Sequence, residues 1–182
     1  MKIKTRIGVD MDDTINNLMS TLLPLYNEKY GDKLQYEDLK KYDIDSIVKP
    51  ECKNFFEEFC NDELMLGLAI EEDAVSILEM LNQKADLMFV TRGHPLTGRV
   101  RDIWLGNNLS FYKTKMLFLC PKKQLLTLDY LIDDHLGNLE EANYTGVLIN
   151  KPWNKNQGLL SHENIVRVDN WKEIGVFFDN VL

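Results

Sequence analysis

Residues 3–14 read IKTRIGVDMDDT, an apolar run that ends in three closely spaced aspartates and a threonine. A short run of this kind, rich in β-branched residues, predicts a strand over residues 3–10 that is buried on both faces. The aspartates then stand at the carboxyl end of this strand. Open α/β sheets bind their ligands at that edge, so this stretch indicates both the fold class and the place of a functional site.

Similar apolar runs recur along the chain and alternate with helical patterns. Further strands are predicted over Asp86–Thr91, Asp129–Asp133 and Thr145–Ile149, with a weaker one over Ile165–Val168. Apolar residues at helical spacing predict helices over Ala74–Leu81, Gly98–Leu105, Asn138–Ala142 and Trp171–Phe178. This alternation predicts an α/β fold built on a doubly wound, Rossmann-like parallel sheet.

The alternation is interrupted between Asp13 and Glu71. Two or three amphipathic helices are predicted there, over residues 15–30, 36–41 and 52–59, and no convincing strand. A connection of this length is better explained by a small helical unit than by a loop. We therefore expect residues 15–71 to form a helical cap above the sheet edge, and residues 1–14 and 72–182 to form the core domain.

Composition narrows the class of protein. The 182 residues are 45% hydrophobic and carry a formal net charge of −8, which is typical of a globular domain and disfavours a nucleic-acid polymer as partner. The three cysteines show no CxxC spacing, so neither a disulfide framework nor a thiolate zinc site is expected. The start of the chain is unlike a signal peptide, and no apolar run approaches the roughly 20 residues of a membrane span. We expect a soluble, cytoplasmic protein with no membrane partner.

The predicted strands end in residues that carry chemistry. The strand over residues 86–91 ends in Thr91, which Arg92 follows, and the strand over residues 129–133 ends in Asp133 and Asp134. Since the carboxyl ends of parallel strands share one edge, at least four carboxylates and a hydroxyl should meet there. Like charges this close are costly without a counter-ion. We therefore expect a hard divalent cation that prefers oxygen ligands, namely Mg²⁺, to offset this repulsion.

A local explanation competes with the metal site. Asp12, Asp13 or Thr14 could cap the helix that follows them, and Asp134 could cap a helix that begins near Gly137. Capping accounts for one acidic pair more easily than for two acidic clusters with a threonine between them. The chain also lacks GxxxxGK[ST], a GxGxxG after the first strand and GxSxG, which argues against nucleoside triphosphatases, dinucleotide enzymes and serine hydrolases.

At these residues the chain resembles the haloacid dehalogenase superfamily of phosphohydrolases. Residues 10–14, DMDDT, match its first motif DxDx[TV], Thr91 matches the second, and Asp133 with Asp134 matches the fourth. Residues 123–134, KQLLTLDYLIDD, are similar to the KTVVSADLLIDD stretch of the 5'(3')-deoxyribonucleotidases. That match points to Lys123 as the lysine of the third motif, and the resemblance covers residues 3–14 and 72–150.

The resemblance implies a Mg²⁺-dependent phosphomonoester hydrolase that acts through an aspartyl-phosphate, with a nucleoside monophosphate as its small-molecule substrate. It implies Asp10 as nucleophile and Asp12 as general acid and base. The implied phosphate-binding residues are Thr91, Arg92 and Lys123. The implied metal ligands are Asp10, Asp12 through its backbone carbonyl, and Asp134, with Asp133 in support.

The same resemblance suggests a substrate pocket in the cap. Tyr42 and Ile44 are candidate counterparts of the aromatic and aliphatic residues that line the family's base pocket. Leu18 stands where the family has an aromatic residue eight positions after the nucleophile, and Asp13 stands where it has glycine or another small residue. These two departures leave the base preference open, together with the sugar, the 5' or 3' position of the phosphate and the oligomeric state.

Three alternatives remain at the level of sequence. The first is a phosphatase of the same superfamily that acts on a sugar phosphate or another small metabolite. The others are a non-catalytic phosphate-binding module and a receiver-like module. In receiver domains, as their family pattern implies, an acidic pair precedes the phosphoaccepting aspartate and a lysine comes last, whereas here Asp133 and Asp134 follow Lys123. Multiple turnover with a generic phosphomonoester distinguishes an enzyme from both modules.

Overall fold

A computed structural model describes residues 4–92, 97–140, 142–158 and 163–182 of the chain. A six-stranded sheet with the order β3-β2-β1-β4-β5-β6 forms its centre, and all neighbouring strands in it are parallel. The strands are β1 (Arg6–Val9), β2 (Asp86–Thr91), β3 (Leu117–Leu119), β4 (Tyr130–Asp133), β5 (Thr145–Ile149) and β6 (Ile165–Val168). The predicted α/β class with a parallel sheet is confirmed.

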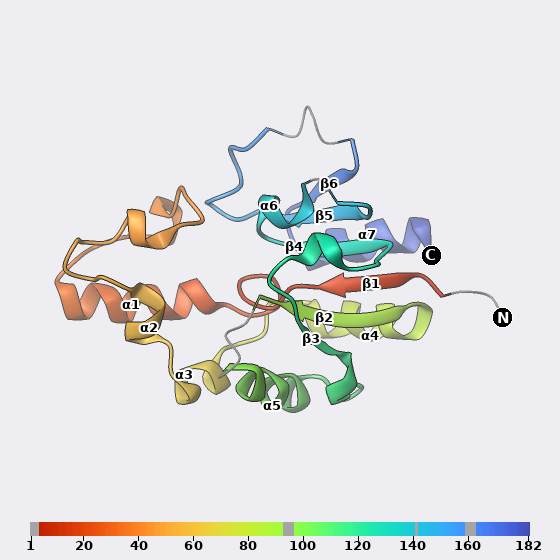
Figure 1. Cartoon of the computed structure of the whole chain (residues 1–182), viewed down its shortest axis with the longest axis horizontal. Coiled ribbons are helices and arrows are strands. Elements are labelled where there is room, and N and C mark those ends of the chain that lie inside the picture. Colours follow the sequence, from red (N-terminus) through yellow and green to blue (C-terminus); the bar gives the residue numbers. More distant parts are fainter. Residues whose placement is uncertain (1–3, 93–96, 141, 159–162) are drawn as a thin grey trace.

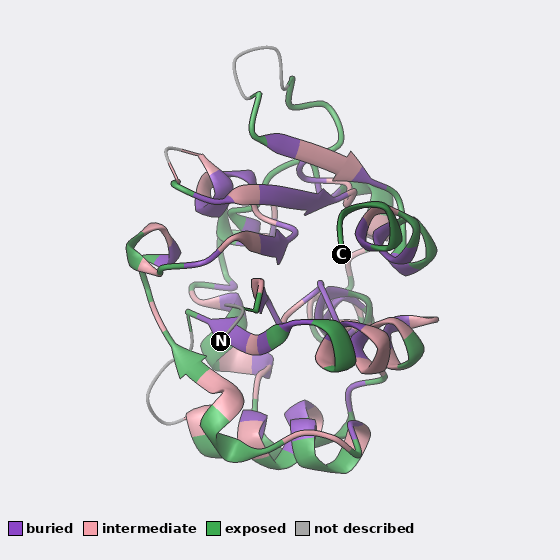
Figure 2. Ribbon diagram, turned by 90° about the vertical axis from the view of Figure 1, so that its right-hand side faces the viewer, coloured by how far each residue is buried: buried purple, intermediate pink, exposed green. Residues whose placement is uncertain are grey.

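Helices cover both faces of this sheet (Figure 2). They are α4 (Ala74–Lys84), α5 (Gly98–Asn108), α6 (Leu136–Leu139) and α7 (Trp171–Val181). The alternation of side chains along β4 shows how the faces are divided: Ile132 belongs to the larger core with residues of α4 and α7, whereas Leu131 packs in a second cluster with Leu136 and Leu139 of α6. The sheet is therefore buried on both sides, as its apolar strands require.

Residues 15–71 project beyond the carboxyl ends of the strands (Figure 1). They contain α1 (Leu18–Tyr30), two short 3₁₀ turns (Tyr36–Asp38 and Ile44–Ser46), α2 (Phe55–Phe59) and α3 (Asp62–Gly67). The entering and leaving segments run side by side, because Asn16 and Ile70 form an antiparallel bridge and the Glu71 N–H donates to the Ile15 carbonyl at 2.9 Å. We refer to residues 15–71 as the inserted segment.

The boundaries of several predicted elements were wrong. The helix predicted over residues 15–30 begins only at Leu18, since a tight turn occupies the residues before it. The helix predicted over residues 52–59 begins at Phe55, where the Asn54 side chain accepts the Glu57 N–H and caps it. The helix predicted over residues 36–41 is a single 3₁₀ turn. The helix predicted over residues 138–142, of which residue 141 lies outside the described residues, is observed over Leu136–Leu139.

In the part of the chain that the structure describes, one strand and one α-helix have no counterpart in the sequence analysis. Strand β3 has only three residues at the edge of the sheet, and Phe118 and Leu119 in it are 42% and 44% exposed, so it lacks the pattern of a buried strand. Helix α3 has six residues and was not predicted either. Among the described residues, no helix has the length and apolar character needed to cross a membrane.

Candidate active site

The turn after β1 sets the direction of the aspartates. The Asp10 N–H extends the ladder to the Ile132 carbonyl at 2.9 Å, and the Met11 carbonyl then accepts the N–H groups of residues 14–16. Asp13 adopts φ +57°, a left-handed conformation that aspartate tolerates better than most residues. Its Oδ1 accepts the Met19 N–H at 2.9 Å, so this carboxylate caps α1, as the local explanation allowed.

Three carboxylates converge at the ends of β1 and β4. Asp10, Asp133 and Asp134 each offer an oxygen within 4.8 Å of the others, and all three side chains are buried. The ammonium group of Lys123, itself fully buried, pairs with Asp10 and with Asp133, the latter at 2.7 Å. Thr14 donates its hydroxyl to Asp134 at 3.2 Å and lies 3.4 Å from Asp10. The cluster thus holds three carboxylates against one ammonium.

Burial makes this charge costly. It raises the pKa of Asp10 to about 7, although Lys123 opposes the shift. Burial, together with the charges of Asp133 and Asp10, also raises the pKa of Asp134 well above its ordinary value. For Lys123, burial works against the charged form, but the two carboxylates beside it raise its pKa overall. A divalent cation would offset the remaining negative charge, and buried carboxylate oxygens are the donors that Mg²⁺ binds. The donor set therefore fits such an ion.

Asp133 has a different environment from its two neighbours. Its Oδ1 accepts the His135 N–H at 2.8 Å, and its Oδ2 accepts Lys123. The Asn138 amide donates to both oxygens, at 3.1 and 3.0 Å. With both oxygens engaged and no exposed surface, Asp133 is placed to hold Lys123 against Asp10.

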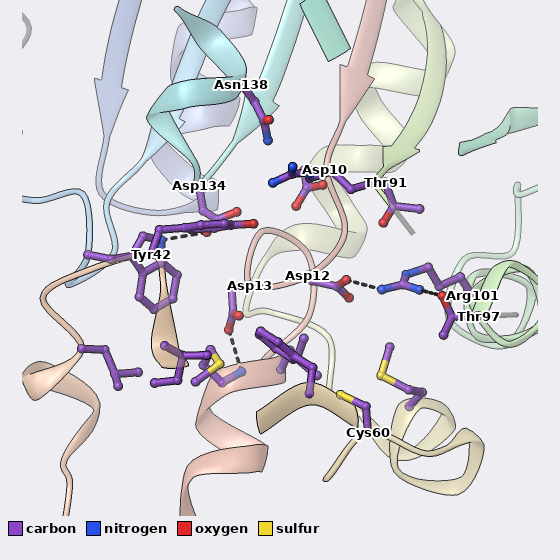
Figure 3. A pocket seen from close by; sticks show the side chains of 18 of the residues that line it. Asp10, Asp12, Asp13, Tyr42, Cys60, Thr91, Thr97, Arg101, Asp134 and Asn138 are labelled. Atoms are coloured by element: carbon purple, nitrogen blue, oxygen red, sulfur yellow. Dashed lines mark hydrogen bonds and ion pairs between the residues drawn. The ribbon is translucent and has the colours of Figure 1, made fainter. Parts of the chain in front are cut away.

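The side chain of Asp12 turns away from this cluster. It forms an ion pair with Arg101 of α5, which also donates to Thr97 (Figure 3). Asp12 also accepts the Asn16 side-chain amide at 3.2 Å. The sequence analysis did not single out Arg101. One signal could have found it: Arg101 is a charged residue among the buried positions of α5, next to Val100 and close to Trp104.

A cavity lies between these residues and the inserted segment (Figure 3). Its volume is about 640 Å³. Eight of the ten site residues predicted from the sequence line it: Asp10, Asp12, Leu18, Tyr42, Ile44, Thr91, Arg92 and Asp134. Lys123 and Asp133 are fully buried, and Lys123 contacts Asp10. Trp153 and Asn138 also line the cavity, and the sequence analysis missed both.

The cavity has a polar and an apolar part. The strand ends supply carboxylates and Thr91. The inserted segment supplies the charged residues Lys41, Glu57 and Asp62 and a larger set of apolar side chains, namely Leu18, Met19, Leu39, Ile44, Phe56 and Met65. Tyr42 stacks on His135, with ring centroids 3.7 Å apart and an interplanar angle of 13°. This pair joins the inserted segment to the loop after β4. Tyr42 nevertheless remains 44% exposed and lines the cavity.

The sheet, the acidic residues after β1 and β4, Thr91 at the end of β2 and the buried Lys123 together define a hydrolase of the haloacid dehalogenase class. Solved structures share this fold. One is a haloacid dehalogenase-like hydrolase from Streptococcus pneumoniae, with a TM-score of 0.68 at 10% identity over 98% of this chain and 100% of that one. Another is a hydrolase of the same superfamily from Deinococcus radiodurans with bound phosphate and sodium, with a TM-score of 0.64 at 12% identity over 98% and 96% of the two chains.

Sequence comparison assigns the family within this class. Residues 4–178 match the model of the family described as 5' nucleotidase, deoxy (pyrimidine), cytosolic type C protein, and the chain belongs to this family. It is a phosphoric monoester hydrolase of the nucleotidase type. A 5'(3')-deoxyribonucleotidase of Clostridium acetobutylicum is 31% identical over 93% of this chain and 92% of its own length. One of Bacillus subtilis is 26% identical over 94% and 97%.

Proposed function

We propose that the protein is a Mg²⁺-dependent 5'(3')-deoxyribonucleotidase that hydrolyses nucleoside monophosphates through an aspartyl-phosphate. The observation that carries this proposal is the buried cluster of Asp10, Asp133 and Asp134 with Lys123, at one end of a cavity to which the inserted segment contributes apolar side chains. The names of the two bacterial relatives support the substrate class. The matching family is described as cytosolic, and we propose the same compartment for this protein.

Asp10 is the proposed nucleophile. Its carboxylate attacks phosphorus in line with the leaving oxygen, the phosphorus–oxygen ester bond breaks, and an acyl phosphate forms on Asp10. Asp12 gives a proton to the departing alkoxide, which is a poor leaving group, and then takes a proton from the water that attacks the acyl phosphate. Inorganic phosphate leaves and Asp10 is restored. The Asp12 side chain points away from the Asp10 cluster, pairs with Arg101 and lines the cavity. This position suits an acid that protonates the leaving oxygen.

The transferring phosphoryl oxygens need positive charge and hydrogen-bond donors. In this proposal the Thr91 hydroxyl, the backbone amides near Arg92 and the Lys123 ammonium bind them. Asp10, the Asp12 carbonyl and Asp134 would hold Mg²⁺, with Asp133 in support. When bound, this ion neutralises charge on the phosphoryl oxygens and favours the ionised forms of the carboxylates around it.

The inserted segment, residues 15–71, is the proposed cap domain, and residues 1–14 and 72–182 are the proposed core domain. A cap has two tasks in this chemistry: it excludes bulk water while the acyl phosphate exists, and it presents the surface that selects the leaving group. Leu18, Tyr42 and Ile44 are the proposed contacts for the nucleoside. All three lie on the cavity wall.

A substrate screen of the purified protein tests this function. Deoxyribonucleoside and ribonucleoside 5'- and 3'-monophosphates are assayed beside sugar phosphates and an aryl phosphate, each with Mg²⁺ and with a chelator. We expect multiple turnover, highest kcat/KM for a deoxyribonucleoside monophosphate, and no activity for Asp10→Asn. A preference for sugar phosphates would contradict the nucleotidase proposal. Full activity in the presence of the chelator would contradict the proposed Mg²⁺ dependence.

A further inference from the structure

The loop after β5 brings a tryptophan to the acidic cluster. Trp153 is 6% exposed and lines the cavity, and its indole Nε1–H donates to Asp134 Oδ2 at 2.8 Å. The next residue, Asn154, donates its side-chain amide to the Asp134 carbonyl at 2.6 Å and to the Ile149 carbonyl at 2.8 Å. The loop is thereby held to the ends of both β4 and β5, so the indole has a defined position relative to Asp134.

Asp134 receives a different kind of support from its neighbours in the cluster. Asp10 and Asp133 both contact the Lys123 ammonium. Within the described part of the chain, the hydrogen bonds to the Asp134 carboxylate come from two neutral donors, the Trp153 indole at Oδ2 and the Thr14 hydroxyl at Oδ1. A carboxylate oxygen has a further lone pair after accepting one hydrogen bond. Neutral donors can therefore orient Asp134 while its charge remains available for a cation.

The indole ring is held in turn by the inserted segment. Tyr36 packs edge-on against Trp153, with ring centroids 5.8 Å apart and an interplanar angle of 72°. Tyr36 lies in a 3₁₀ turn of the inserted segment, and Trp153 lies in the core. The orientation of Asp134 is thus linked, through one aromatic side chain, to the part of the molecule that covers the cavity.

We propose that Trp153 is a positioning residue for the divalent cation: its indole N–H fixes the Asp134 carboxylate in the orientation that the ion needs. This inference rests on the metal site of the proposed function. Hydrogen-bond donors behind a ligand carboxylate orient it, and their removal costs metal affinity about 10- to 100-fold. Without the indole donor, Asp134 keeps only the Thr14 hydroxyl at Oδ1, so its carboxylate can rotate about that contact before the ion arrives, and this added freedom opposes binding.

Calorimetric titration of the metal-free protein with MgCl₂ tests this role without any assay of activity. Trp153→Phe removes the N–H donor and keeps an aromatic ring against Tyr36, and we expect it to weaken Mg²⁺ binding about 10- to 100-fold at unchanged stoichiometry. Trp104→Phe is the matched control, because Trp104 is also buried and donates its indole N–H to the Leu68 carbonyl, outside the cluster. The control is expected to bind Mg²⁺ as the unmodified protein does.

Two outcomes separate this inference from the proposed function. Equal Mg²⁺ affinity in Trp153→Phe and the unmodified protein overturns the role of Trp153 alone. No Mg²⁺ binding by the unmodified protein overturns the metal site and this inference together. If Trp153→Phe does not fold, fluorine NMR of the 5-fluorotryptophan-labelled protein replaces it, since the chain has only three tryptophans. The Trp153 resonance should then shift on Mg²⁺ saturation by more than the Trp104 resonance, and an unshifted Trp153 resonance overturns the proposal.

Discussion

At the scale of single residues, the charge of each group in the acidic cluster affects its neighbours. Asp10, Lys123 and Asp134 show this. Lys123 neutralises part of the charge of Asp10 and Asp133, but Asp134 pairs with no cation among the described residues and instead accepts two neutral hydrogen bonds. The raised pKa values of Asp10 and Asp134, caused first by burial, express the cost of this imbalance. The residues that most need a counter-ion are also those to which we assign metal binding.

The role proposed for Asp12 predicts a split between leaving groups. Asp12→Asn removes a proton donor from the cavity and leaves Asp10 and its partners unchanged. An aryl phosphate leaves without much protonation, so the variant should keep measurable activity on it while losing nearly all activity on a nucleoside monophosphate. Steady-state kinetics on both substrates check this. Equal fractional losses on the two substrates would show that Asp12 does not protonate the leaving group.

The environment of Asp13 leads to a prediction of how the free energy of unfolding changes with pH. Burial raises the pKa of Asp13 to about 7, against roughly 3.9 in an unfolded chain, so the folded state binds the proton more tightly. Between these two values the unfolded state has lost the proton and the folded state retains it. The free energy of unfolding therefore falls as pH rises from about 4 to 7, by up to about 1.4 kcal/mol per pH unit for one group. Asp10 and Asp134 contribute in the same direction.

Asp13→Asn should make this fall shallower, because the amide does not titrate and keeps an oxygen for the Met19 N–H. Thermal unfolding in a chelator, measured at intervals from pH 4.5 to 7, gives the slope. Asp43→Asn, at an exposed position of the inserted segment, is the control and should keep the original slope. The same slope in Asp13→Asn and the unmodified protein would contradict the assignment.

At the scale of elements, the loop between the two 3₁₀ turns carries Tyr42 to the cavity. Stacking on a base is worth about 1–3 kcal/mol by analogy with single-strand binding, so Tyr42→Ala should lower kcat/KM for nucleoside monophosphates by roughly 5- to 150-fold. Hydrolysis of an aryl phosphate too small to reach Tyr42 should scarcely change. Kinetics on both substrates, with folding checked by circular dichroism, test this.

The stacking of Tyr42 on His135 suggests a result that would contradict a role in base binding. Because this pair joins the inserted segment to the core, its loss could disturb the cavity as a whole. A uniform loss of activity on every substrate would then assign Tyr42 to the contact between the two parts of the chain. Unchanged activity on all substrates would place the nucleoside elsewhere in the cavity.

At the scale of the whole molecule, Mg²⁺ binding should raise the thermal stability of the folded protein. An ion that binds the folded state alone stabilises it by mass action, by about 2.7 kcal/mol at one hundred times its dissociation constant. We therefore expect Mg²⁺ to raise the thermal midpoint of chelator-treated protein, and Asp134→Ala to reduce this response together with the activity. Differential scanning calorimetry over a series of Mg²⁺ concentrations measures the effect. A midpoint independent of Mg²⁺ in the unmodified protein would contradict the metal site.

Much of the fold follows from local pattern. β2, β5 and β6 match their predicted bounds, and β1 and β4 lie within theirs, because each is a short apolar run between polar residues. Strand β3 was not predicted, because a three-residue edge strand with two exposed side chains lacks this apolar pattern. The residues placed by motif and by strand end, such as Asp10 and Asp134, lie at the cavity, whereas Arg101 and Trp153 carry no motif and were not found.

By itself, then, the sequence determined which segments are buried strands, that acidic residues follow two of them, and that the chain resembles a family of phosphohydrolases. The tertiary structure decided which side chains meet: Lys123 with Asp10, 113 residues away, Arg101 with Asp12, 89 residues away, and Trp153 with Asp134. The physical reason is that apolar burial is encoded in neighbouring residues, whose period shows which face is buried. Contacts of one side chain with another depend on strand order, loop path and rotamer, which only the packing of the whole chain sets.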